Sequence, residues 1–198
     1  MRTAQTEWTP PRRSVSNLVV RVRISRTSRI ASAAWGQNGH AELGQGDTTP
    51  RQYPTKVVGL SNPTKVLVAF GLSHNSAVCA QDGDNVRCWG DNSAGAIGTN
   101  TTVDPILSPT AVVMQSGGIL AGVKDIELGL GDFAALQSDG TIWIWGYQFT
   151  RYAANYGLTN VLAIGWAGPG SYGGPRYLTS DGVYHSAMTT WSVNCNAM

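Results

Sequence analysis

Charged residues are scarce in this chain, since Asp, Glu, Lys and Arg make up only 13% of its 198 residues. Disordered chains carry far more charge and far fewer apolar residues than the 42% found here, so the composition predicts a folded domain with a sizeable core. No apolar run is long enough to cross a bilayer, and we expect no membrane span. The start of the chain also lacks the continuous apolar centre of a secretory signal.

Motifs for catalysis or metal binding are also lacking. The chain contains no His-Glu-x-x-His, Cys-x-x-Cys or nucleophile-elbow motif, and His40, His74 and His185 occupy unrelated places. The glycine-rich stretches 44–46 and 168–175 have no lysine of the kind found in phosphate-binding loops. We therefore expect no cofactor and no metal, and we assign no catalytic residue.

Glycine, by contrast, is abundant, and it recurs directly after tryptophan. The pairs Trp35-Gly36, Trp89-Gly90 and Trp145-Gly146 are separated by 54 and 56 residues. The first two pairs also lead into similar sequences, which are Asn38 with Leu43-Gly44 and Asn92 with Ile97-Gly98. A fixed period of this size predicts a repeat architecture.

Each repeat is predicted to contain short strands joined by turns. The expected strands are 65–70, 76–80 and 86–89 in one repeat and 124–128, 133–137 and 141–145 in the next, with 54–58 and 110–113 as the remaining strand of each. Asp139-Gly140 is expected to form a two-residue hairpin turn, and Asp82 and Asp181 precede glycine in equivalent turns. Four short strands per repeat indicate an all-β fold of four-stranded antiparallel β-propeller blades.

Together these elements resemble the regulator of chromosome condensation repeat family. Residues 35–90 match its pattern nearly throughout, 89–146 match but carry Asp132 where the family usually has His, and 145–186 match only at their ends. The resemblance implies a β-propeller in which His74 is a structural residue. Trp35, Trp89 and Trp145 are expected to fill equivalent, largely buried positions between neighbouring sheets.

The number of repeats is smaller than the resemblance implies, because family members usually close a ring of seven blades. We expect an incomplete ring of about three to four blades over residues 30–186, followed by a tail at 187–198. Such a chain is a fragment of a longer protein, completes its ring by association, or has altered ends that cap the stack.

The amino-terminal residues 1–29 form a basic segment with seven arginines and a single acidic residue, Glu7. Such a segment could contact nucleic acid or an anionic surface. Because it lacks interleaved aromatic residues, we favour a solvated arm or a degenerate edge strand, and nucleic acid is the less favoured partner.

Two of the three cysteines are predicted to form a disulfide. If Gln81 pairs with Val86 across the intervening turn, the same register places Cys79 opposite Cys88. Two buried thiols in a cytosolic protein are the alternative. Cys195 remains as a spare thiol or an intermolecular bridge.

A binding function fits this organisation better than catalysis. The segments 37–52 and 91–107 are long and differ between the repeats, so we expect recognition residues there. The candidates are Glu42, Asp47, Arg51, Asp91, Asn92 and Asp104.

The family resemblance implies protein recognition, and the paired cysteines are similar to those of its exported bacterial members. We therefore expect an extracellular or cell-envelope module, of bacterial type, whose partner is another protein or a second copy. The alternative is a propeller enzyme, of hydrolase or lyase type, with a site built from scattered loop residues.

Overall fold

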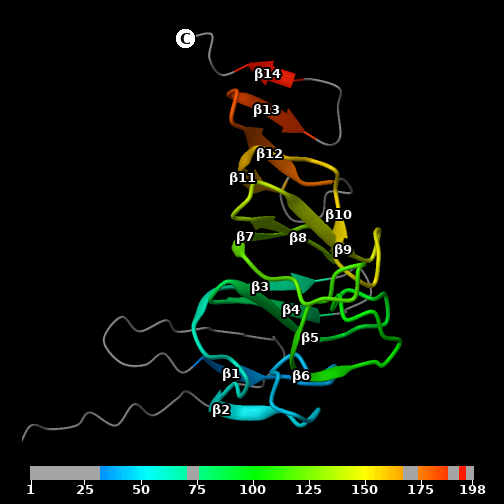
Figure 1. Cartoon of the computed structure of the whole chain (residues 1–198). Coiled ribbons are helices and arrows are strands. Elements are labelled where there is room, and N and C mark those ends of the chain that lie inside the picture. Colours follow the sequence, from blue (N-terminus) through cyan, green and yellow to red (C-terminus); the bar gives the residue numbers. More distant parts are fainter. Residues whose placement is uncertain (1–31, 71–75, 167–173, 187–191, 195–198) are drawn as a thin grey trace, which may run out of the picture.

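The computed structural model describes residues 32–70, 76–166, 174–186 and 192–194. These residues form four antiparallel sheets that are stacked in sequence order (Figure 1). Within these ranges the chain forms strands and turns only, and no helix capable of crossing a membrane is found there. The all-β fold of four-stranded propeller blades predicted from the sequence is confirmed.

Three of the four sheets have four strands, and the first has two described strands. The first sheet contains β1 (Ala33–Gly36) and β2 (Arg51–Lys56). The second contains β3 (Pro63–Phe70), β4 (Ser76–Asp82), β5 (Asn85–Gly90) and β6 (Ile106–Ala111). The third contains β7 (Val123–Leu128), β8 (Asp132–Gln137), β9 (Ile142–Gly146) and β10 (Ala154–Asn155). The fourth contains β11 (Val161–Gly165), β12 (Arg176–Thr179), β13 (Val183–Ser186) and β14 (Ser192–Asn194).

The boundaries of the sequence repeat do not coincide with the boundaries of the sheets, and this corrects the predicted grouping of the strands. The pattern predicts that 54–58 joins the sheet of 65–70, but β2 pairs with β1, and β6 likewise pairs with β5. The chain leaves each Trp-Gly strand, forms a long loop and returns antiparallel to the same strand, with Gly36 opposite Arg51 and Gly90 opposite Ile106. Each outer strand therefore completes the sheet of the preceding tryptophan.

The hairpin turns are placed as predicted, with one difference in length. Asp82 pairs with Asn85, so the β4–β5 turn has two residues, and Gly83 adopts a φ of 67°. In the third sheet the Gln137 amide donates to the Thr141 carbonyl, so the connection is three residues long and not the predicted two. Gly140, with a φ of 84°, ends this longer turn, where a residue with a Cβ atom would be strained.

A separate apolar core fills the space between each pair of neighbouring sheets. The first and second sheets enclose Ala34, Leu43, Val57, Val78, Ala80 and Trp89. Between the second and third sheets lie residues such as Cys79, Cys88, Val112, Ile126, Phe133 and Trp145. The third and fourth sheets enclose Ala134, Leu136, Ile142, Ile144 and Val161, with Tyr177 at the margin. Stacking of sheets is thus the source of apolar burial in this fold.

The repeated tryptophans pack against glycines of the preceding repeat. The Trp89 indole N–H donates to the Glu42 carbonyl at 2.8 Å, and a Cβ atom added at Gly44 would lie 2.7 Å from Trp89 Nε1. A Cβ atom at Gly98 would similarly lie 2.8 Å from Trp145 Cδ1. In both contacts the indole ring of one sheet is buried against the loop of the preceding repeat, at a glycine that has no side chain.

Trp35 occupies the equivalent strand position, but it is less completely buried than the other two repeated tryptophans. Trp89 and Trp145 are buried, whereas Trp35 is half-buried. No sheet precedes β1 among the described residues, so no loop glycine covers the Trp35 ring there. His74, the other predicted structural residue, lies outside the described residues.

The predicted disulfide is present between Cys79 and Cys88, which face each other across β4 and β5. Gln81 pairs with Val86, as the predicted register requires. Both cysteines are fully buried on the side of the second sheet that contacts the third. Cys195 lies outside the described residues.

Ionic contacts add to the apolar contacts between the second and third sheets. Lys65 Nζ on β3 lies 2.9 Å from Asp125 Oδ1 and 2.6 Å from Glu127 Oε1 on β7. Partial burial opposes the charged ammonium, but the hydrogen bonds to Glu127 and Asp125 outweigh this effect and raise the pKa of Lys65. Because these side chains remain about one-third exposed, we expect their contribution to stability to be modest.

The tryptophan-glycine contact predicts unequal costs for two glycine substitutions. Gly98 and Gly157 share a positive φ (73° and 77°), but only Gly98 faces an indole ring. Gly157→Ala should cost about 1 kcal/mol for backbone strain alone. Gly98→Ala should cost about 2 to 4 kcal/mol, because overpacking against Trp145 is added to that strain. Guanidinium denaturation of both variants measures the difference, and equal losses would show that Trp145 does not depend on this close approach.

Candidate protein-recognition face

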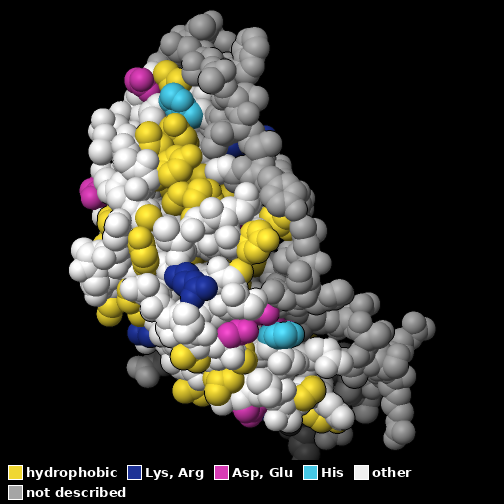
Figure 2. All heavy atoms as spheres, turned by 90° about the vertical axis from the view of Figure 1, so that its right-hand side faces the viewer, with side chains coloured by type: hydrophobic (Ala, Val, Ile, Leu, Met, Phe, Trp, Pro, Cys, Tyr) yellow, Lys and Arg dark blue, Asp and Glu magenta, His cyan; other side chains and the backbone are white. Residues whose placement is uncertain are grey.

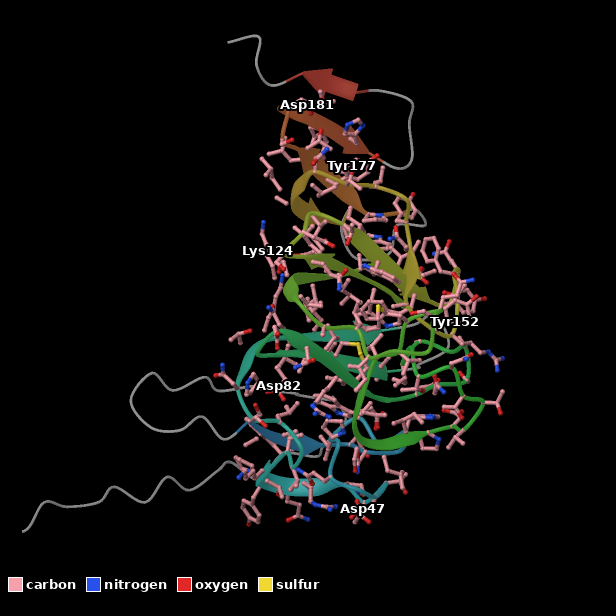
Figure 3. The ribbon with its side chains drawn as sticks, in the orientation of Figure 1. Asp47, Asp82, Lys124, Tyr152, Tyr177 and Asp181 are labelled. Atoms are coloured by element: carbon pink, nitrogen blue, oxygen red, sulfur yellow. A yellow bond between two sulfur atoms is a disulfide. The ribbon has the colours of Figure 1, made fainter. Side chains whose placement is uncertain are left out.

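The loops that follow the Trp-Gly pairs lie on one side of the stack of sheets. We call this side the loop face, formed by residues 37–51, 91–105 and 147–153. Figure 3 places Tyr152 on this side and Lys124 and Asp82 on the opposite side. Viewed directly, the loop face carries few charged side chains, and hydrophobic side chains form a band in its upper half (Figure 2).

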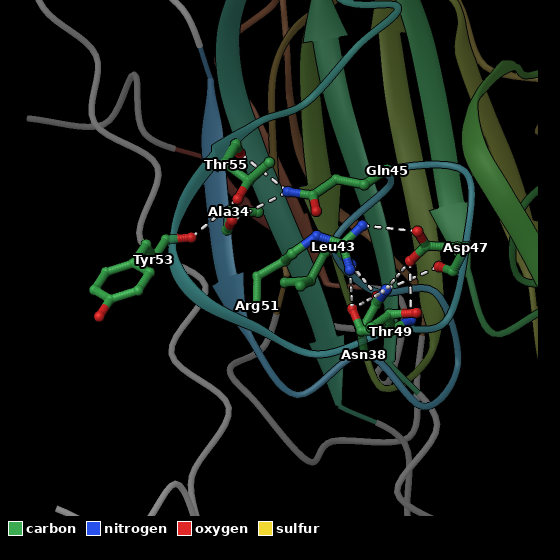
Figure 4. A network of polar contacts seen from close by, with 9 residues as sticks. All are labelled: Ala34, Asn38, Leu43, Gln45, Asp47, Thr49, Arg51, Tyr53 and Thr55. Carbon is green, nitrogen blue, oxygen red and sulfur yellow. Dashed lines mark hydrogen bonds and ion pairs between the residues drawn. The ribbon is translucent and has the colours of Figure 1, made fainter. Parts of the chain in front are cut away.

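A buried asparagine shapes the first of these loops (Figure 4). The Asn38 Oδ1 atom accepts from the Leu43 amide at 2.9 Å, and its Nδ2 donates to the carbonyls of Asp47 at 2.8 Å and Thr49 at 3.1 Å. One side chain thus closes the loop by satisfying backbone groups at both its near and far ends. We call this arrangement the asparagine latch.

The second loop repeats the asparagine latch with the same spacing. Asn92 Oδ1 accepts from the Ile97 amide at 3.2 Å, and Nδ2 donates to Thr101 at 3.2 Å and Val103 at 2.8 Å. In both loops the partners lie 5, 9 and 11 residues after the asparagine. Asn38 is therefore a structural residue that is absent from the residues predicted above. The recurrence of Asn after Trp-Gly is the sequence signal that could have identified it.

Three of the six predicted recognition residues are buried and hold the loops together. They are Glu42, Asp91 and Asn92. Glu42 Oε2 accepts from the His40 amide at 2.9 Å. Asp91 accepts from the amide and hydroxyl of Ser93 at 2.9 and 2.6 Å, and its other oxygen lies 3.3 Å from Nδ1 of His40. Glu42 thus holds the first loop, and the contact of His40 with Asp91 joins the first loop to the second.

The other three predicted residues, Asp47, Arg51 and Asp104, reach the surface. Arg51 Nη2 lies 2.7 Å from Asp47 Oδ2. The Arg51 hydrogen bond, together with one from the Thr49 amide, lowers the pKa of Asp47. Asp104 is exposed, and its Oδ1 accepts from the Asn92 amide at 2.7 Å. These side chains can meet a partner, and their role in binding stays a prediction.

The third loop is built differently and exposes residues that the sequence did not single out. Tyr147 is 64% exposed, and Arg151 is exposed at the surface while its stem covers Gly95 of the second loop. The Asn100 amide donates to the Arg151 carbonyl at 2.6 Å, which links these loops. The short spacing after Trp145 was the available signal, because a shorter loop covers less of its own repeat.

Asp132, at the position where the family usually has His, anchors this third loop. Its two oxygens accept from the backbone amide and the side-chain Nε2 of Gln148, both at 2.8 Å. Gln148 follows Trp145 at the spacing at which Asn92 follows Trp89. Burial outweighs the Gln148 hydrogen bonds and raises the pKa of Asp132.

The loop face offers contact groups and no assembled metal site. Within the described ranges, no three His, Cys, Asp or Glu side chains are grouped so that they could hold a metal ion. Its buried carboxylates accept hydrogen bonds from neighbouring amides, hydroxyls and side chains of the loops. The arrangement is suited to presenting variable surface residues on fixed loops.

Comparison with known proteins identifies the repeat. Residues 34–78 match the family model "Regulator of chromosome condensation (RCC1) repeat". The chain therefore contains a repeat of the regulator of chromosome condensation type. Over 112 residues it is 29% identical to human E3 ubiquitin-protein ligase HERC2, and this match covers 57% of the chain and 2% of HERC2. It is 34% identical over 84 residues to mouse Protein RCC2, covering 42% of the chain and 16% of that protein. The chain therefore spans only a small part of these relatives that share the repeat.

Solved structures show the same repeat fold. Human WBSCR16 superposes with a TM-score of 0.57 and 17% identity, covering 78% of this chain and 42% of that one. Yeast RCC1 (Prp20), solved bound to Kap60, gives a TM-score of 0.52 and 20% identity. This superposition covers 79% of this chain and 37% of the yeast chain. At these identities the likeness establishes the β-propeller fold, of which the repeats described here form a part.

The buried Asp132 predicts a pH dependence of stability with a definite sign. Because its folded pKa is raised above 3.8, the folded protein binds this proton more tightly than the unfolded chain. The contribution of Asp132 should therefore become less favourable as pH rises from below 3.8 through its folded pKa. The free energy of unfolding of Asp132→Asn, relative to the wild type, should rise over this window.

Asp139 is a control with the opposite sign, because its hydrogen bonds with Thr141 lower its pKa. Its contribution is present above 3.8 and is lost as pH falls through its folded pKa, so the relative stability of Asp139→Asn should fall as pH rises through this range. Urea denaturation at several pH values measures both differences. A flat profile for Asp132→Asn would contradict the assignment of a raised pKa.

Proposed function

We propose that this chain is an extracellular or cell-envelope protein-interaction module that recognises a protein partner through its loop face. The observation that carries the proposal is the asparagine latch, which keeps the same geometry in two loops whose surface residues differ. A fixed loop base with variable exposed residues is an arrangement in which specificity can change without loss of the fold. The RCC1-type propeller fold agrees with an interaction module.

The exposed chemistry of the loop face suits a protein partner. The third loop presents the aromatic ring of Tyr147 and the guanidinium of Arg151, and the first loop adds the partly exposed Asp47 and Arg51. Tyrosine and arginine are over-represented among the residues that contribute most to binding between proteins. Val103, which is 60% exposed, adds apolar area in the second loop.

Structural relatives support this class of function. Yeast RCC1 (Prp20) was solved bound to Kap60, and a second structure of Prp20p is described together with its binding to Gsp1p and histones. These partners belong to the yeast protein. For this chain they support protein recognition as the class of activity, and the partner proposed here is a different protein suited to its own loop residues.

The disulfide supports the proposed location. Cys79 and Cys88 are bonded within a sheet core, and structural disulfides persist mainly in oxidising compartments. We also propose that the chain associates with itself, because its first and last sheets have outer faces that no described sheet covers.

Affinity capture tests the recognition proposal. Three baits are compared: the wild-type chain, a triple variant (Asp47→Ala, Arg51→Ala, Tyr147→Ala) and a control variant. The control, Asp84→Lys, lies in the exposed β4–β5 turn. Glu42 is left intact because it is buried. Quantitative mass spectrometry of a cell-envelope extract should find proteins held by wild type and control but reduced at least tenfold on the triple variant.

The thermal midpoint of the triple variant should stay close to that of the wild type, since exposed substitutions usually change stability little. Equal retention by all three baits would contradict recognition by the loop face. Equal loss on the control and the triple variant would contradict it as well.

A further inference from the structure

We propose that two copies of this chain associate head to tail, with the first sheet of one copy packed on the fourth sheet of the other. The head face is the outer face of the first sheet, with Trp35 and Pro54. The tail face is the outer face of the fourth sheet, with Leu162, Leu178 and Tyr184. This inference rests on the proposed self-association and is independent of recognition by the loop face.

The head face is one half of an intersheet contact, and no described sheet supplies the other half. Ala34 pairs with Thr55 and Gly36 with Arg51, and the second sheet repeats this register as Cys88 with Thr110 and Gly90 with Ile106. Trp35 therefore stands where Trp89 stands in the second sheet. Trp89 is buried against the preceding repeat, whereas Trp35 is half-buried.

A proline shows the same difference between the two sheets. Pro109 is buried, and a Cβ atom added at Gly59 of the preceding repeat would lie 3.8 Å from it. Pro54, at the equivalent place beside Thr55, is exposed. Trp35 and Pro54 together mark the surface that a preceding sheet would cover.

The tail face is the complementary half, and no described sheet packs on it either. β4 and β8 are buried along almost their whole length, because sheets lie on both sides of them, whereas every residue of β12 is only half-buried. Tyr177 packs toward the third sheet and stacks on His185 at a centroid distance of 4.6 Å. Neighbouring strand residues point to opposite faces, so Leu178 and its cross-strand partner Tyr184 lie on the outer face.

Leu162 extends this apolar surface. Leu162 lies in β11 at the register shift between Val161 and Ala163. Lys124 occupies the equivalent position in β7, at the register shift between Val123 and Asp125. Lys124 reaches forward to the next sheet, where its Nζ donates to the Leu162 carbonyl at 3.0 Å. By the same geometry Leu162, which is 50% exposed, points to the outer face of the fourth sheet.

The repeat identifies a second copy as the occupant of these faces. Each core inside the chain joins the tail side of one sheet to the head side of the next, and this happens between all three neighbouring pairs. The chain carries the two halves of this contact at opposite ends of the stack (Figure 1). A contact between unlike surfaces is heterologous, so it extends to rings or chains of copies and differs from a two-fold dimer.

Two blocking variants test the direction of assembly. Pro54→Glu blocks the head face and Leu162→Glu blocks the tail face, and both residues are exposed, so the fold should persist. By light scattering coupled to size exclusion, the average mass of the wild type should rise with concentration. Each variant alone should remain monomeric, and an equimolar mixture should form a heterodimer of twice the chain mass and nothing larger. A second pair of single variants, Trp35→Glu on the head face and Leu178→Glu on the tail face, repeats the experiment at half-buried positions. Near-ultraviolet circular dichroism confirms that these two variants are folded.

Each other outcome overturns a defined part of the proposal. A wild type that is monomeric at every concentration removes self-association and with it the head-to-tail contact. A blocked variant that still self-associates as strongly as the wild type shows that copies associate through another surface. The triple loop-face variant should assemble like the wild type, so that failure of assembly and failure of partner recognition are separate results.

Discussion

The packing of a tryptophan on a glycine of the preceding repeat is the contact on which this structure depends. Trp89 lies against Gly44, and Trp145 lies against Gly98, at a distance that leaves no room for a side chain. The asparagine latch shapes the loop that carries each glycine. Asn38 and Asn92 accept hydrogen bonds from the amides of Leu43 and Ile97, and these two residues directly precede the two glycines. Loop geometry, indole burial and sheet stacking are thus successive consequences of one repeated pattern.

This dependence explains which parts of the fold could be predicted from sequence. The Trp-Gly period and the Asp-Gly turns predicted the strands, and the register across the β4–β5 turn predicted the disulfide of Cys79 and Cys88, because these features depend on local geometry. The grouping of β2 with β1 was missed, because it depends on how a long loop returns. The half-burial of Trp35 was missed because it depends on what lies outside its own repeat.

The recognition residues were harder to predict than the fold. Glu42, Asp91 and Asn92 are polar residues in loops, a pattern typical of exposed positions, yet the structure buries them against backbone amides and carbonyls. Their burial leaves the loop face to Asp47, Arg51, Val103 and Tyr147, which differ in type between the loops. The division between buried polar residues that fix the loops and exposed residues that vary is the physical basis of the proposed recognition.

Hydrogen exchange read by mass spectrometry most directly tests the claim that each sheet is stabilised by the sheets on either side. In dilute, monomeric protein, the amides of β4 and β8, which have sheets on both sides, should exchange slowest. The amides of β1 and β12, in sheets that have a described neighbouring sheet on one side only, should exchange at least tenfold faster. Equal protection of β8 and β12 in the monomer would contradict the account, because it would mean that neighbouring sheets add nothing to local stability.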